Sequence, residues 1–208
     1  MSRALNFKES GLSKREWSLL KKLSTPKKVQ DFINSLSFNH EKDGETYMSV
    51  SRTLGEKTAH CFEGALVAAA ALWAHGEEPL ILDLQATSRD VDHVVALFKK
   101  GKYWGSISKT NHGVLRYREP IYRTVRELVL SFFNEYILND GTKTLRGYSK
   151  PFNLRHEGTY WLSDENDLYD LMHKIDNSPH YKILTQSQLR NLRKADLIER
   201  KMSGLAES

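Results

Sequence analysis

A shortage of cysteine and of long apolar runs sets the first limits on what this 208-residue chain can be. Cys61 is its single cysteine, so no internal disulfide can form, which is typical of proteins from a reducing compartment. No stretch approaches the roughly 18 consecutive apolar residues of a membrane-spanning helix. The first residues mix charges throughout and lack the apolar segment of a secretory signal. We therefore expect a cytoplasmic protein with no membrane partner.

Motifs for metals, cofactors and nucleic acids are also missing. The eight histidines show no HxxxH or HExxH spacing, and there is no glycine-rich phosphate loop, zinc-finger spacing or RNA-binding motif. The formal net charge of +5 raises the question of nucleic acid. However, the excess is spread along the chain, with small runs at Lys27–Lys28, Lys99–Lys102 and Arg190–Lys194. The sequence thus predicts no metal or cofactor, and favours a generally basic surface over a dedicated nucleic-acid site.

The composition that remains is that of a globular protein, with 39% hydrophobic and 27% charged residues. A chain of this length suits one core with modest additions. The boundaries that we predict are an N-terminal extension over 1–24, a core over 25–160, a C-terminal helical appendage over 161–200 and a disordered tail over 201–208.

The clearest predicted element is a helix from Cys61 to His75, which is rich in alanine and leucine and apolar almost all round. A helix without a polar face belongs inside a domain, and Gly76 is well placed to end it. Three strand-like segments follow at 79–85, 92–100 and 102–109, the last two joined by a tight turn at Gly101. We therefore predict an α+β fold in which the cysteine-bearing helix packs on a small antiparallel sheet, with flanking helices.

Amphipathic spacing and capping residues predict the flanking elements. Ser13 and Thr25 are placed to cap two early helices, Ser163 and Thr185 two late ones. The predicted helices are 13–23, 25–36, 46–54, 122–137, 164–175 and 186–200, with loops or irregular structure over 38–45 and 139–162.

Cys61 is placed where a thiol can do chemistry, at the first turn of the buried helix. Free N–H groups and the helix dipole there favour a thiolate, and they can stabilise an oxyanion on a carbonyl that the sulfur attacks. His93 lies at the start of a neighbouring strand, and a Cys–His pair is the usual means of activating a thiol. The alternative is that Cys61 is simply a small buried hydrophobic residue.

The order of these elements resembles the transglutaminase-like superfamily within the papain-like cysteine enzymes. The matching segments are AHCFEGALVAAAALWAHGEEPLIL over 59–82 and DHVVALFKKGKYWGSIS over 92–108, about a quarter of the chain. The resemblance implies a papain-like fold, Cys61 as nucleophile and His93 as base. It also implies acyl-transfer chemistry on a peptide or small amide-containing substrate.

The sequence departs from the family at the third catalytic position. Counting from Trp104, the place of the usual aspartate is taken by Ser108, and Asn111 and His112 follow nearby. Asparagine orients the histidine in papain-like triads, and a serine hydroxyl can do so more weakly. Ser108 and Asn111 are both therefore candidates to orient His93, and His112 is a competing candidate for the base.

Substrate contacts are predicted around the segment 111–123. Arg116, Tyr117 and Arg118 together suit an anionic or planar ligand, although the same alternation arises on a half-solvated strand. With Trp104 and His112 they form the predicted substrate-binding set.

Residues next to the proposed pair have structural interpretations that we favour. Asp92 suits a solvated or capping role, His60 neighbours the helix cap, and Glu63 complements the helix dipole. Three hypotheses remain open: a cysteine hydrolase or acyltransferase, a catalytically silent relative serving as a binding module for an anionic ligand, and a nucleic-acid-associated protein. Oligomeric state is left open.

Overall fold

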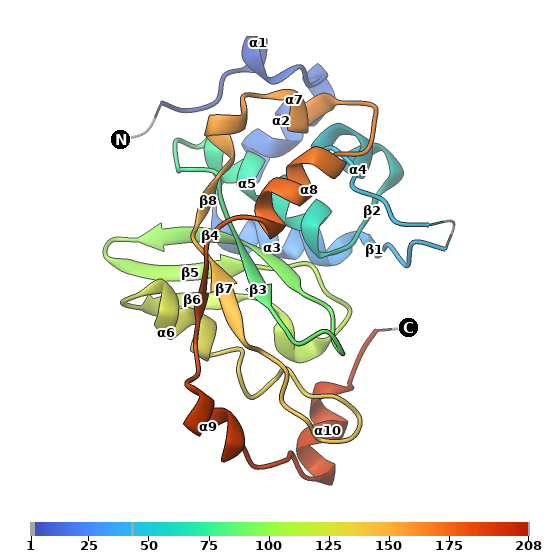
Figure 1. The fold of residues 1–208 in the computed structure, drawn as a ribbon. Coiled ribbons are helices and arrows are strands. Elements are labelled where there is room, and N and C mark those ends of the chain that lie inside the picture. The colour runs from blue at the N-terminus through green and yellow to red at the C-terminus, as the bar shows by residue number, and fades with distance from the viewer. Residues whose placement is uncertain (1–2, 43, 208) are drawn as a thin grey trace.

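A computed structural model describes residues 3–42 and 44–207 and has a seven-stranded antiparallel sheet at its centre (Figure 1). Its strand order is β6-β5-β4-β3-β7-β9. Strand β8 also pairs with β3, at Leu80 and Ile81, whereas β7 pairs with the other end of β3, at Leu84 and Gln85. Neighbouring strands are antiparallel throughout. The strands are β3 (Leu80–Gln85), β4 (His93–Lys100), β5 (Tyr103–Ile107), β6 (Arg118–Tyr122), β7 (Gly147–Ser149), β8 (Phe152–Asn153) and β9 (His180–Lys182).

Helix α5 (Cys61–Ala74) packs against this sheet and forms the centre of the main core. Every residue from Phe62 to Ala74 is buried, because alanine, leucine and valine leave no polar face to turn toward water. The helix ends beside Gly76, whose positive φ of 89° is favourable for glycine. The α+β prediction, with the cysteine-bearing helix on an antiparallel sheet, is confirmed.

Strands β3 and β4 divide the core into two layers. Ile81, Val94 and Ala96 pack toward α5, whereas Leu82 and Val95 belong to a second apolar cluster on the other face. Burial on both faces explains why these strands read as continuous apolar runs rather than as alternating patterns. Gly101, at φ 62°, makes the predicted turn between β4 and β5.

Most of the flanking helices gather on the α5 side of the sheet (Figure 1). Ser13 and Thr25 cap α2 and α3 as predicted, each accepting a hydrogen bond from a first-turn N–H. A two-stranded parallel sheet of β1 (Ser37–Phe38) and β2 (Thr58–Ala59) ties α3 to the start of α5. The helices here are α1 (Phe7–Ser10), α2 (Lys14–Lys22), α3 (Pro26–Ser35), α4 (Val50–Glu56), α7 (Tyr160–Ser163) and α8 (Tyr169–Asp176).

The second half of the chain differs from the prediction in its element lengths. The predicted helix 122–137 is only α6 (Val125–Leu130), because the chain continues in turns that still bury Phe132 and Tyr136. Long-range pairing also makes strands β7 and β8 within the predicted irregular stretch 139–162. The predicted helix 186–200 is two short ones, α9 (Gln186–Arg190) and α10 (Leu197–Ser203).

Residues 203–207 are held against the segment that follows β5, where the sequence predicts a loose tail. The N–H of Gly113 donates to the Leu205 carbonyl at 3.0 Å, and the N–H of Glu207 donates to the Asn111 carbonyl at 2.9 Å. Gly113 begins a single 3-10 turn, η1 (Gly113–Leu115), and a second, η2 (Leu154–Glu157), follows β8. Ser208 lies outside the described residues.

Candidate functional site

A cavity of about 780 Å³ opens where the start of α5 meets the ends of the central strands. Cys61 and His93 both line it. Its described walls come from seven parts of the chain: β1 with the loop after it, the start of α5, β3 with its connection to β4, the segment after β5, the turns after α6, helix α8, and the end of α10. The cavity therefore brings together residues from positions 38 to 203.

Cys61 is the first residue of α5, and His60 caps that helix. The Nδ1 atom of His60 accepts the N–H of Phe62 at 3.2 Å, while its Nε2 lies 2.7 Å from the Thr46 carbonyl. The two contacts fix the ring in place. Burial opposes protonation of His60, but hydrogen bonding and charge from Cys61, together with the charge of Glu63, raise its pKa to about 9.

The surroundings of Cys61 favour the thiolate. Burial opposes ionisation of the thiol, but hydrogen bonding and charge from His60 and His93 lower the pKa of Cys61 well below its ordinary value. The helix start adds to this effect, because the dipole of α5 presents partial positive charge there. Cys61 is partly exposed, so a ligand in the cavity can reach it.

His93 is buried and bonds to Ser108, the residue immediately after β5. Its Nε2 lies 2.6 Å from Ser108 Oγ, and Ser108 itself is fully buried. The side-chain amide of Gln30, on α3, clamps the backbone of Ser108 from both sides. Its Oε1 accepts the Ser108 N–H at 3.0 Å, and its Nε2 donates to the Ser108 carbonyl at 2.9 Å.

Gly64 allows the segment after β5 to approach α5 closely. A Cβ atom at Gly64 would lie 2.3 Å from Lys109 Cβ, so no larger residue fits there without movement. Lys109 is buried, and its Nζ donates to the Leu36 carbonyl at 2.5 Å. Gly64 and Gln30 together position Ser108 beside His93.

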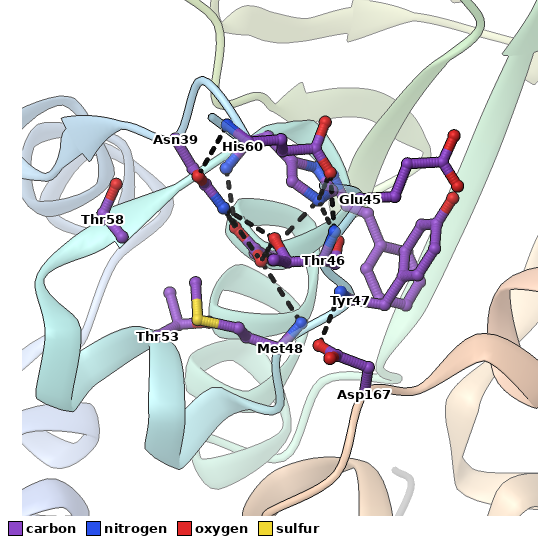
Figure 2. A network of polar contacts seen from close by, with 12 residues as sticks. Asn39, Glu45, Thr46, Tyr47, Met48, Thr53, Thr58, His60 and Asp167 are labelled. Atoms are coloured by element: carbon purple, nitrogen blue, oxygen red, sulfur yellow. Dashed lines mark hydrogen bonds and ion pairs between the residues drawn. The ribbon is translucent and has the colours of Figure 1, made fainter. Parts of the chain in front are cut away.

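A buried carboxylate, Glu63, anchors the wall formed by the loop after β1. Figure 2 shows the loop residues Asn39, Thr46 and Met48 gathered with His60 in this polar network. It accepts hydrogen bonds from the Thr46 hydroxyl at 3.1 Å, the Met48 N–H at 3.2 Å and the His60 N–H at 2.8 Å. The Asn39 amide also donates to it at 3.3 Å. Glu63 therefore joins this loop to the first turn of α5, as a structural residue in line with the sequence interpretation.

The two other polar residues predicted after Ser108 line the cavity without any contact to His93 in the structure. The carbonyl of Asn111 accepts the Glu207 N–H, and Nδ1 of His112 lies 3.0 Å from the Ser203 carbonyl. Of the two candidates to orient His93, Ser108 is the one in hydrogen-bond contact with it.

The remaining predicted substrate-binding residues are absent from the described lining of the cavity. Arg116 pairs with Glu207, and Tyr117 stacks on Phe98 with ring centroids 5.7 Å apart. Arg118 pairs with Glu135 and lies over the Phe132 ring, and Trp104 lies under Lys99. In this structure these four side chains contact other strands and turns of the chain.

Sequence reasoning missed Gln30, Asp83 and Tyr136 as parts of this region. Asp83 lies on β3, where its Oδ2 bonds Nε2 of His180 at 2.9 Å, and burial raises the pKa of its carboxyl to about 6. A carboxylate inside an otherwise apolar strand, LILDLQ, was the signal for Asp83. Gln30 and Tyr136 gave no signal, since each lies on an ordinary amphipathic segment.

The described residues contain no group of three His, Cys, Asp or Glu side chains placed to hold a metal ion. Among them there is also no helix both long and apolar enough to cross a membrane. Comparison of the chain with protein-family models and with curated proteins found no match.

Proposed function

We propose that this protein is a thiol enzyme that transfers or hydrolyses acyl groups, with Cys61 as nucleophile, His93 as general base and Ser108 as the residue that orients His93. These roles are those of a transglutaminase-like or papain-like enzyme, the family that the sequence resembles, with a hydroxyl proposed for the third position. The observation that carries the proposal is the 2.6 Å hydrogen bond between Ser108 Oγ and Nε2 of His93, a buried histidine that, together with His60, lowers the thiol pKa at a cavity wall.

The proposed reaction proceeds through a thioester. The Cys61 thiolate attacks the carbonyl carbon, so an S–C bond forms and the carbonyl electron pair moves to oxygen. When the intermediate collapses, the bond to the leaving group breaks and protonated His93 gives that group its proton. His93 then takes a proton from water or an amine, which attacks the thioester and releases Cys61.

The start of α5 supplies the donor for the oxyanion in this proposal. First-turn N–H groups have no intrahelical partner, and the N–H of Cys61 is one of them. The Phe62 N–H already donates to His60 and is not free to bond the oxyanion. The donor in this proposal is therefore the Cys61 N–H, next to the sulfur. His60 therefore acts in positioning, while His93 moves the proton.

The alternative of a silent module for an anionic ligand receives less support from the cavity. Seven carboxylate side chains line it, whereas Lys109, its single described lysine or arginine, donates to a backbone carbonyl. An anion would meet repulsion on most sides. The same charge argument disfavours nucleic acid at this site.

The test is the pH dependence of Cys61 alkylation by iodoacetamide in the native protein, in His93→Ala and in His112→Ala. We expect a half-reactive pH well below the value of about 8.5 for a free thiol. His93→Ala should raise it by at least about one unit, because the stabilising imidazolium is lost. His112 lines the same cavity, and His112→Ala should leave the half-reactive pH unchanged.

Two results would reject the proposal. One is modification that titrates near the free-thiol value and ignores His93→Ala, which would make Cys61 a structural residue. The other is an effect of His112→Ala as large as that of His93→Ala, which would mean that the base is assigned to the wrong histidine.

A further inference from the structure

The cavity carries a charge opposite to that of the whole chain. The protein has a formal net charge of +5, yet carboxylates dominate the cavity wall. Glu135 is neutralised by Arg118, and Asp83 shares a hydrogen bond with His180. The carboxylates that line the cavity are Glu41, Glu45, Asp83, Asp90, Asp92, Glu135 and Asp176.

Three buried oxygen atoms among the described residues of this wall have no hydrogen-bond partner, which is the second and independent observation. They are Oδ1 of Asp83, Oγ1 of Thr87 and the hydroxyl of Tyr136. Asp83 is 1% exposed and Tyr136 is 4% exposed. Buried polar atoms are nearly always paired in folded proteins, so these unpaired oxygens in one cavity point to a ligand that bonds to them.

Asp83 and Tyr136 line the same cavity as the nucleophile Cys61. Burial and the negative charges of Cys61, Asp83, Asp90 and Asp92 raise the pKa of Tyr136 well above its ordinary value. The phenol is therefore protonated, and its oxygen still has lone pairs to accept a hydrogen bond. The sulfur, the phenol and the carboxylates form one neighbourhood.

We propose that the cavity binds the ammonium group of an aminoacyl donor, that is, an amide or ester of an amino acid whose amine is free. Oδ1 of Asp83 and the Tyr136 oxygen accept two of the three ammonium protons, and Asp92 and Asp176 add negative charge. Because this subsite and Cys61 line one cavity, an amine held there would place the carbonyl of the same donor within the cavity that the sulfur faces. The inference rests on the proposed function and names the substrate class for it.

The first test uses methanethiosulfonate reagents with aminoethyl, methyl and sulfonatoethyl groups, which are cationic, neutral and anionic. In each, the Cys61 thiolate attacks the sulfenyl sulfur, forming a disulfide and releasing methanesulfinate. We expect the cation-to-anion rate ratio to exceed that of 2-mercaptoethanol by about tenfold or more. Asp83→Asn, Tyr136→Phe and Asp176→Asn should each lower the ratio. Asp170→Asn, on the same helix as Asp176 but outside the described lining, should leave it unchanged.

The second test compares glycine and N-acetylglycine 4-nitrophenyl esters as acyl donors. The free amine should give the larger kcat/KM, and Tyr136→Phe and Asp176→Asn should reduce that preference. Asp176 is exposed and Tyr136→Phe keeps the ring, so both variants should fold.

The outcomes separate the two proposals. A Cys61 that reacts with none of the three reagents faster than 2-mercaptoethanol rejects the proposed function itself. If Cys61 reacts fast with all three reagents but its cation-to-anion rate ratio equals that of 2-mercaptoethanol, the ammonium subsite alone is rejected. The subsite is also rejected if the cation-to-anion rate ratio stays high in all three subsite variants. Equal kcat/KM values for the two glycine esters would reject it as well.

Discussion

Ser108 lies beside His93, and in the proposed assignment it takes the place of the aspartate of the family that the sequence resembles. A hydroxyl can accept the Nε2 proton of an imidazolium, but it offers a dipole where a carboxylate offers a full charge. A carboxylate at a fully buried position would need its own partners, and the described neighbours of Ser108 satisfy its backbone rather than a charge. In the proposed mechanism, the negative charge of the thiolate stabilises the imidazolium that Ser108 stabilises only weakly.

Ser108→Ala should weaken this support without removing it. Loss of one hydrogen bond to a charged group, worth about 1.5 kcal/mol, should raise the half-reactive pH of Cys61 by about one unit. The measurement is the same iodoacetamide titration, with Ser106→Ala as a buried serine control on β5. An unchanged midpoint in Ser108→Ala would show that the hydroxyl does not act on the thiol through His93.

At the residue scale, the sequence predicts those site residues that lie on motif-like segments. Cys61, His93 and Ser108 follow one another in a recognisable order of helix and strands, so the sequence alone is enough to propose them. Gln30 could not be proposed in this way, because its contact with Ser108 spans 78 residues and depends on how α3 packs. Asp83 stands out as an unusual residue, but its partner and its orphaned oxygen follow only from the tertiary fold.

At the element scale, the contact between α5 and the segment after β5 determines where Ser108 lies. Gly64 belongs to the first turn and a half of α5, and its missing side chain is the space that Lys109 fills. The glycine weakens the helix intrinsically, yet it allows the backbone after β5 to approach. The arrangement thus links the position of the base to that of the nucleophile through backbone packing.

Gly64→Ala should destabilise the protein although alanine is the better helix former. Overpacking of this kind costs about 1–3 kcal/mol and should displace Lys109 and its neighbour Ser108. Gly55→Ala in α4, where an added Cβ meets nothing within 4 Å, is the matched control and should stabilise by up to about 1 kcal/mol. Urea unfolding measures both variants, and equal stabilisation by the two would contradict this account of Gly64.

Helices and strands specified by nearby residues could be predicted from the sequence. Strands that form only by pairing with distant segments could not. Helix α5 is apolar on all sides and strands β3 to β5 are joined by short connections, so periodicity and turn residues suffice for them. Strands β7 and β9 have three residues each and exist because distant segments pair with them. The prediction of one helix over 122–137 was wrong, because some of its apolar side chains are buried from turns and only the others from α6.

For the whole molecule, the buried carboxyl of Asp83 sets a pH dependence of stability. Burial raises its pKa to about 6, above the value of about 3.9 for an unfolded chain, so the native state binds this proton more tightly. By linkage, its contribution to stability is complete below about pH 4 and is lost as the pH rises through about 6.

Asp83→Asn should remove that part of the pH dependence. In the native protein we expect this group to lower the free energy of unfolding by about 2–3 kcal/mol between about pH 4 and 7, a loss that the asparagine variant lacks. Urea unfolding at several pH values measures the difference between the two curves, with Asp170→Asn as the control. Parallel curves across this range would contradict the assignment to Asp83.

The distribution of the cavity lining along the chain has a consequence for biosynthesis. Cys61, His93 and Ser108 leave the ribosome early, but Asp176 and Ser203, which complete the wall, are made later. The contact between His112 and Ser203 spans 91 residues, so a nascent chain holds its thiol beside an unfinished enclosure. In the proposed enzyme, substrate selectivity would therefore arise only once the chain has been made as far as Ser203, after the thiol itself has been made.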